Sequence, residues 1–265
     1  MNLYKDLSNR TKSVACAIAG TGVFLLLVTG WPLRRPSRVA AAEPAQSSDI
    51  HVANMTKSFT VVKTSVNGRN RVGARQIALS LRNDYDKAVT AYAAGRDGVY
   101  SRRDLITAQA IPPGGTVEFQ DATPPPPDDA GVVVTVLAVV LEDGSGDGDP
   151  KIVQEFLDSR AAELAQEVRI KRLLEKAAAA ADEKFPEEFE ALKSKVLGLP
   201  VKEAGRSFHY NAALNDTRNL ELYHLDQLQR IRTELGSDEC RARLMAAIER
   251  KSIKMAKLAP RKLER

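Results

Sequence analysis

The chain has 265 residues, of which 43% are hydrophobic and 28% are charged, and its formal net charge is +5. Residues 1–42 contain six lysines and arginines and one aspartate, so the rest of the chain carries 33 basic and 33 acidic side chains. A neutral remainder lacks the excess of cations on which non-specific binding to nucleic acid depends. We therefore expect no nucleic-acid partner.

Residues 1–42 have the pattern of an export signal. Lys5, Arg10 and Lys12 precede an uncharged segment that begins at Ser13 and ends at Leu33, and alanines occupy positions 40 to 42. A signal peptide combines a basic start, an apolar core and small residues before the cleavage position. The uncharged segment also matches the length of a membrane-spanning helix, which is roughly 20 residues. The sequence thus predicts an exported, periplasmic or extracytoplasmic protein, with the leader either cleaved or kept as a membrane anchor. A cytoplasmic-facing anchored protein is the remaining alternative.

Residues 43–56 are predicted to form a linker, because they are rich in alanine, glutamine, serine and aspartate and lack a hydrophobic period. The hydrophobic period changes after this segment. In residues 57–149 apolar and polar side chains alternate, as they do in β-strands. Ile77, Leu79 and Leu81, for example, fall on one face of a strand while polar side chains occupy the other.

Turn residues divide this β-region into short strands. Residues 83–86 have turn chemistry, and residues 88–93 are expected to return as the partner of the preceding strand. Residues 132–141 are apolar on both faces, which is typical of a central strand covered on both sides. Several short strands with proline and glycine turns predict an antiparallel immunoglobulin-like β-sandwich.

Residues 150–265 are dominated instead by alanine, glutamate, lysine, arginine and leucine. Helices are predicted over residues 150–182, 186–198, 208–235 and 238–258. In the third of them an apolar stripe runs from Leu214 to Leu235 and is interrupted by Glu221. Short connections predict antiparallel neighbours, and therefore an α-helical hairpin or bundle. The predicted fold class is α+β, with the β-sandwich followed by the helical region.

The loop over residues 143–149 is the sharpest local motif. Its candidate calcium ligands are Asp143, Ser145, Asp147 and Asp149. The first three stand at positions 1, 3 and 5 of a calcium-binding loop, with glycine at position 6 and a helix to follow. Position 12, however, is Gln154 rather than a chelating glutamate, and a strand precedes the loop. The favoured interpretation is therefore a strand-to-helix turn, in which Asp149 caps the helix and Pro150 occupies its first position, and calcium binding is the alternative.

Residues 241–265 form a basic C-terminal tail, in which cations far outnumber glutamates. The cations are Arg241, Arg243, Arg250, Lys251, Lys254, Lys257, Arg261, Lys262 and Arg265. The favoured interpretation of such a tail is the solvated face of a helix that packs on its neighbours. The alternative is contact with an anionic surface such as lipid or acidic polysaccharide, and membrane contact through this tail or through residues 13–33 stays open. Cys240 shares an apolar face with Leu244, which predicts a buried thiol.

No residue pattern indicates a catalytic or cofactor site. His209 and His224 fall on one predicted helix, too far apart in the sequence to have the spacing of paired metal ligands. No serine stands in a nucleophile elbow, and the glycines of the 143–149 loop lack the lysine of a phosphate-binding loop. We therefore favour a protein that is not an enzyme and has no cofactor other than the calcium of the alternative hypothesis, and an enzyme of an unrecognised family is the third alternative.

Four segments resemble a recurring bacterial pattern. They are residues 77–84 (IALSLRND), 87–92 (KAVTAY), 111–114 (IPPG) and 139–144 (VVLEDG). The pattern is similar to that of exported bacterial proteins in which an immunoglobulin-like sandwich precedes a helical region. There a strand pair reads L-x-N-x-x-x-K-x-I-x-A-Y and a later strand ends in F-x-D-G, whereas Leu141 replaces the aromatic residue here. The resemblance implies export and a sandwich over residues 57–150, and it implies no activity.

Together these patterns predict an exported, non-enzymatic envelope protein that acts as a protein-interaction or structural module. Edge strands and an amphipathic helical half are suited to contact with a protein partner. The alternative is a calcium or ligand binder that uses the loop from Asp143 to Asp149.

Overall fold

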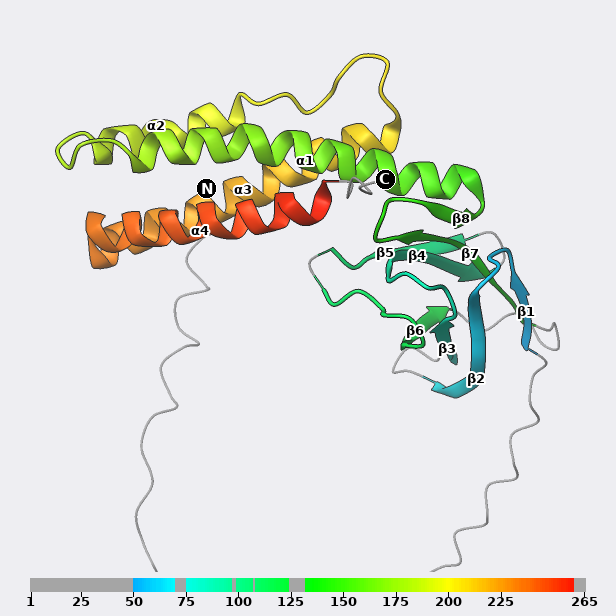
Figure 1. Ribbon diagram of the computed structural model, residues 1–265. Helices are drawn as coiled ribbons and strands as arrows, with labels where there is room; N and C mark the ends of the chain where they lie inside the picture. Colours follow the sequence, from blue (N-terminus) through cyan, green and yellow to red (C-terminus); the bar gives the residue numbers. More distant parts are fainter. Residues whose placement is uncertain (1–49, 70–74, 97–98, 107, 124–131, 260–265) are drawn as a thin grey trace, which may run out of the picture. The chain divides into compact units, whose positions relative to one another are not determined.

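The computed structural model describes residues 50–69, 75–96, 99–106, 108–123 and 132–259, which belong to one compact unit, Gln46–Arg265. In this part of the chain eight strands precede four helices (Figure 1). The strands are β1 (Ile50–Asn54), β2 (Phe59–Arg69), β3 (Arg75–Asn83), β4 (Val89–Arg96), β5 (Val99–Asp104), β6 (Thr116–Thr123), β7 (Val132–Leu141) and β8 (Gly146–Gly148). The helices are α1 (Pro150–Ala178), α2 (Phe185–Leu197), α3 (Phe208–Leu235) and α4 (Ser237–Leu258). The predicted leader, residues 1–42, lies outside the described residues.

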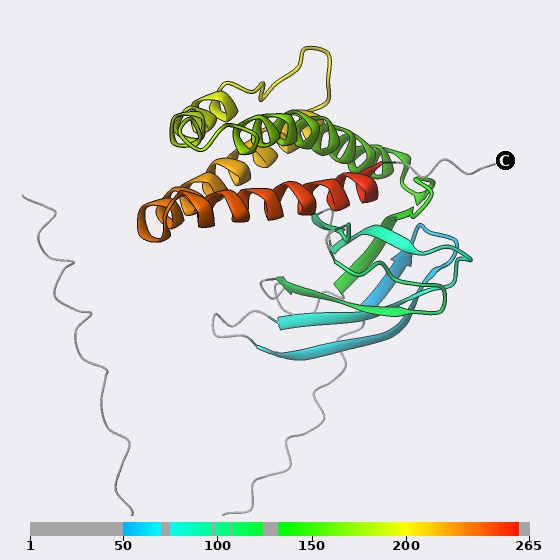
Figure 2. The same ribbon diagram turned by 60° about the vertical axis from the view of Figure 1, so that its left-hand side comes forward.

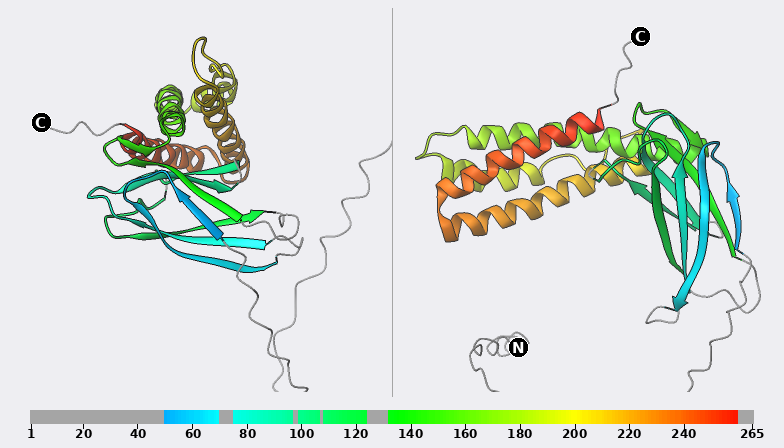
Figure 3. Two further views of the ribbon diagram at one scale, coloured as in Figure 1. Left: turned by 90° about the vertical axis from the view of Figure 1, so that its right-hand side faces the viewer. Right: turned by 60° about the horizontal axis from the view of Figure 1, so that its bottom comes forward.

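The strands form two sheets that share one core (Figure 3). One sheet has the order β1-β7-β4-β5, with β8 also paired to β7, and the other has the order β2-β3-β6. Phe59, Leu79 and Phe119 of the second sheet are buried in the same cluster as Tyr92 and Val136 of the first. This burial of alternate side chains explains the period-2 pattern of the sequence.

The first strand corrects two predictions. Residues 50–54 lie in the segment predicted as a linker, but they form β1, and β1 pairs with β7 in the parallel direction rather than antiparallel. The side chains of residues 51–54 are all exposed. Because β1 joins the edge of β7 through backbone hydrogen bonds and buries no side-chain face, no hydrophobic period marks it in the sequence.

The turn at residues 83–86 also differs from the prediction. It does not join two neighbouring strands: β3 pairs with β2 and β6, whereas β4 belongs to the other sheet. Asn83 is fully buried at this crossing, where its Nδ2 donates to the carbonyl oxygens of Lys87 and Ile111 and its Oδ1 accepts from the Tyr85 N–H. The hydrogen bonds of the Asn83 side chain thus hold the chain where it passes from one sheet to the other, although no hairpin joins the two strands there.

Strand β7 is covered on both faces, as its composition predicts. Val136 packs into the core between the sheets, whereas Ala138 and Val140 pack against Ile152 and Phe156 of α1. The first turns of α1 therefore lie on the outer face of the β4–β7 sheet.

The four helices share a second core, and Figure 2 shows α1, α3 and α4 running side by side. Leu174, Phe189, Leu225 and Leu244 contribute to this core from α1, α2, α3 and α4 respectively. The observed bounds agree with the predicted helices to within one residue, except that α1 ends at Ala178, short of its predicted end at position 182. Within the described part of the chain, no helix has the length and apolar character of a membrane span.

Candidate functional site

The loop that follows β7 uses its carboxylates for internal contacts. Asp143 accepts from Lys87 Nζ at 2.7 Å, and from the backbone N–H and Oγ of Ser145 at 3.0 and 2.6 Å. Burial raises the pKa of Asp143, but these three hydrogen bonds outweigh burial and lower that pKa to about 2. The Asp143 carboxylate is therefore ionised, and its negative charge is already compensated by Lys87 and by the donors of Ser145.

Asp147 and Asp149 are engaged in the same way. Asp147 accepts from the Lys57 N–H at 2.6 Å and from the Tyr85 hydroxyl. Burial and the bond to Asp147 raise the pKa of Tyr85 to about 12. Asp149 caps α1 by accepting from the Lys151 N–H at 2.8 Å, with proline at the first helical position. The cap at Asp149 and Pro150 agrees with the strand-to-helix turn proposed for this loop, but residues 146–148 form β8, which pairs antiparallel with β7 and was not predicted.

The four predicted calcium ligands do not converge on one point. In the part of the chain that the structure describes, no group of three or more acidic, histidine or cysteine side chains is placed to hold a metal ion. Asp143 bonds to Lys87 in the segment before β4, Asp147 to the segment before β2, and Asp149 to its own helix. A cation here would have to displace these donors before it could be bound.

Three of the six described cations of the basic C-terminal tail, Arg241, Lys251 and Lys254, contact residues outside α4, whereas Arg243 pairs with Glu239 of the same helix. Arg241 stacks over Phe185 at 4.5 Å from the ring centroid, donates to the Ala180 carbonyl and pairs with Asp182. Lys251 and Lys254 are bound by glutamates. Arg261, Lys262 and Arg265 lie outside the described residues. Much of the tail's basic charge therefore stabilises helix packing.

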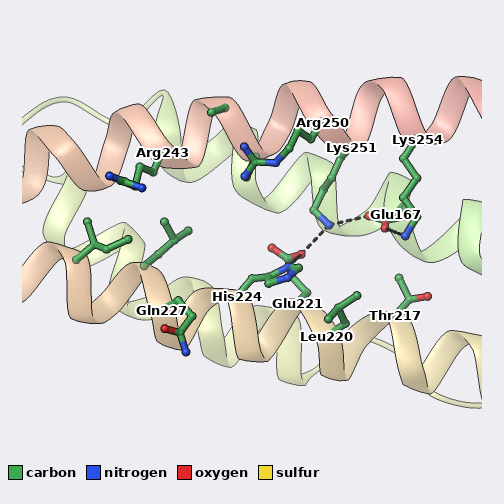
Figure 4. Close-up of a pocket in the computed structure, with 14 residues that line it drawn as sticks. Glu167, Thr217, Leu220, Glu221, His224, Gln227, Arg243, Arg250, Lys251 and Lys254 are labelled. Carbon is green, nitrogen blue, oxygen red and sulfur yellow. Dashed lines mark hydrogen bonds and ion pairs between the residues drawn. The ribbon is translucent and has the colours of Figure 1, made fainter. Parts of the chain in front are cut away.

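A network of buried charges joins α1, α3 and α4 (Figure 4). Lys251 Nζ lies 2.8 Å from Glu167 and 2.6 Å from Glu221, and both glutamate side chains are only 3% exposed. Lys254 bridges Glu167 to Glu163 at 2.8 and 2.5 Å. Burial raises the pKa of Glu167, but the attraction of Lys251 and its hydrogen bond outweigh burial, so that pKa lies below its usual range.

Next to this network, a groove of about 450 Å³ that is open to solvent runs between α3 and α4. We call it the α3–α4 groove, and its apolar lining consists of Leu220, Leu228, Ile231, Ala246 and Ala247. Leu220 is 51% exposed and Ala246 is also exposed, whereas Leu228 is buried. The groove thus presents apolar surface to solvent, and its floor is closed by the ion pairs of Lys251.

The rim of the α3–α4 groove is cationic on the α4 side. Figure 4 shows Arg243 and Arg250 on α4, opposite His224 and Gln227 on α3. Arg243 is 55% exposed and forms an i,i+4 ion pair with Glu239, while Arg250 is exposed and has no ion-pair partner in the described ranges. Since the two glutamates of the floor are buried and bound to lysines, and Arg243 is paired with Glu239, the unpaired charge open to solvent among the described groove residues is that of Arg250.

A second polar cluster fastens the helices to the β4–β7 sheet. Arg160 of α1 donates to both carboxylate oxygens of Asp104 at 2.9 and 3.1 Å and to the carbonyl and hydroxyl of Thr90. Nearby, Glu155 accepts from the Tyr100 hydroxyl at 2.8 Å and lies 3.3 Å from His209 Nε2. These contacts fix the junction between β-strands and helices.

Sequence reasoning missed the α3–α4 groove but recorded two signs of it. Glu221 interrupts the apolar stripe of its helix, and Lys251 and Lys254 belong to the basic tail. An acidic residue in the apolar stripe of one helix and cations on the next predict a buried pair between them. Cys240 is buried, as predicted, and burial raises the pKa of its thiol. His209 and His224 each approach a glutamate instead of sharing a ligand.

Comparison with known protein families, with curated proteins and with solved structures finds no match to this chain. The function is therefore inferred from the chemistry of the α3–α4 groove and from the pattern of the N-terminal segment, positions 1 to 42.

Proposed function

We propose that this chain is an exported, non-enzymatic envelope protein that binds a protein partner. Its two sheets are proposed to form an immunoglobulin-like sandwich, and its helices a bundle whose α3–α4 groove is the binding surface. The observation that carries the proposal is the exposure of Leu220 and Ala246 in a groove with a neutralised floor. Exposed apolar surface bounded by polar side chains is typical of protein-binding sites.

The buried ionisable groups beneath the groove favour binding over chemistry. Glu167 and Glu221 each pair with Lys251, so their charges are used in holding three helices together. Export is supported separately by the cations, apolar segment and alanines of residues 1–42.

Binding is tested by affinity purification from envelope extracts with three forms of the protein. The form Leu220→Asp places a charge in the groove, and Leu197→Asp places one on α2, at a leucine that is equally exposed (57%) but lies outside the groove. We expect one partner to be retained by the wild type and by Leu197→Asp and to be lost from Leu220→Asp. Equal retention by all three forms would contradict a role for the groove.

Export is tested by cell fractionation with intact-mass measurement. A protein in the extracytoplasmic fraction, either beginning at Glu43 or full-length in the membrane, agrees with the proposal. A full-length protein in the cytoplasmic fraction contradicts it.

A further inference from the structure

We infer that the partner of the α3–α4 groove is an amphipathic helix with acidic residues beside its apolar face. This inference rests on the proposed function and adds the chemistry of the partner. It follows from three properties of the groove: its direction, its small side chains and its exposed charge.

The direction of the groove suits a helix. It follows α3 from Thr217 to Ile231, a length of about 21 Å at 1.5 Å per residue, which corresponds to an occupant helix of about 14 residues. Ala246 and Ala247 line the α4 side, and their small side chains allow a helical backbone to approach closely. Leu220 and Ile231 on the α3 side provide apolar contacts at either end of the groove.

The charge of the groove selects an acidic occupant. The glutamates at the floor are 3% exposed and already hold Lys251 and Lys254, so they do not repel an incoming carboxylate in the way free glutamates would. Arg243 and Arg250 remain on the rim, and Arg250 is without an ion-pair partner among the described residues. A carboxylate on the occupant can pair with Arg250 directly, and one near Arg243 can share that guanidinium with Glu239. Complementary charge of this kind determines specificity more than affinity.

The test uses the full-length protein and two fluorescent peptides of about 14 residues, each held helical by an internal cross-link. One is built from leucine, alanine and glutamate, and in the other lysine replaces every glutamate. Binding is measured by fluorescence anisotropy with the wild type and with the double variant Arg243→Glu/Arg250→Glu. Both arginines are exposed, so the double variant is expected to fold, which circular dichroism verifies.

We expect the wild type to bind the glutamate peptide at least about tenfold more tightly than the lysine peptide, and the double variant to reverse this order. Equal binding of the two peptides, or binding of neither, would overturn the inference. Self-association of the wild type in sedimentation, abolished in the double variant, would also overturn it, because the occupant would then be a second copy. Any of these results could occur even if Leu220→Asp loses a partner that the wild type retains. The helical, acidic partner can therefore be ruled out while the proposal that the groove binds a protein still stands.

Discussion

Lys251 and Glu167 are separated by 84 residues in the chain, yet Nζ of one lies 2.8 Å from the carboxylate of the other. The contact joins α4 to α1, and the same lysine reaches Glu221 on α3. Two carboxylates are thereby buried at the place where three helices meet, while Lys251 and Lys254 remain partly exposed. The ion pairs fix the helices that form the α3–α4 groove and neutralise its floor.

Replacing Lys251 by methionine is expected to destabilise the protein by about 3 kcal/mol, because a buried carboxylate that loses its partner is left uncompensated. Methionine fills much of the volume of the lysine side chain, and Lys254 still pairs with Glu167. The loss of stability therefore comes mainly from Glu221, which loses its ion pair with Lys251. Urea unfolding followed by circular dichroism measures the change. The control is Lys193→Met, which breaks a pair with Asp226 that is more than half exposed on the lysine side and should cost less than about 1 kcal/mol. Similar losses in the two variants would show that the network is not buried as described.

The pair of Lys87 and Asp143 predicts a pH dependence. The pKa of Asp143 in the folded protein is about 2, below the ordinary value of 3.8, so its ionisation stabilises the fold above about pH 4. That contribution is lost as the pH falls through the folded pKa. In Lys87→Met the pKa of Asp143 should rise toward its ordinary value and the variant should lose less stability between pH 4 and pH 2. Carboxyl titration by nuclear magnetic resonance measures the pKa directly, and an unchanged value in Lys87→Met would contradict the assignment.

Calcium is expected to leave the thermal midpoint of the protein unchanged. Asp143 and Asp147 are bound by Lys87, Ser145, Lys57 and Tyr85, so a cation must displace these donors. Thermal unfolding with calcium and with chelator makes the comparison. A midpoint that rises with calcium, and no longer rises in Asp147→Ala, would instead support the calcium-loop hypothesis.

Gly148→Ala is expected to be severely destabilising, by at least about 3 kcal/mol. Gly148 has a φ of +97°, and an added Cβ would lie 2.1 Å from the Leu137 carbonyl oxygen. Gly205→Ala is the matched control, because Gly205 has a φ of +77° but open space around it, and strain alone should cost about 1 kcal/mol. Thermal unfolding measures the loss of stability in each variant, and the difference between them is the contribution of the clash with Leu137. Equal losses in the two variants would contradict the close pairing of β8 with β7.

Arg160→Met is expected to loosen the junction between the sheet and α1. The substitution removes hydrogen bonds to Asp104 and Thr90, and amide hydrogen exchange in β5 and the first turns of α1 should become faster. Arg82→Met is a suitable comparison, since it removes only an exposed pair with Asp84 and should leave exchange there unaltered. Unchanged exchange in Arg160→Met would mean that apolar contacts alone hold the junction.

The helices could be predicted from the sequence because their signals are local. Asp149 and Pro150 mark the start of α1, and the stripe that begins at Leu214 identifies the buried face of α3. The strand β1 could not be predicted, because it is held by backbone pairing with β7 and buries no alternating face. The site was missed for a related reason. The partners of Lys251 lie on two other helices, and only the fold shows which residues of α3 and α4 face one another.

Site-specific photo-cross-linking in intact cells is the most direct test of whether the α3–α4 groove binds a protein. A photoreactive residue is placed at position 220, inside the groove, or at position 197, a similarly exposed leucine outside it. We predict a discrete cross-linked product from position 220 that is absent from position 197. The same products from both positions, or none from either, would contradict binding at the groove.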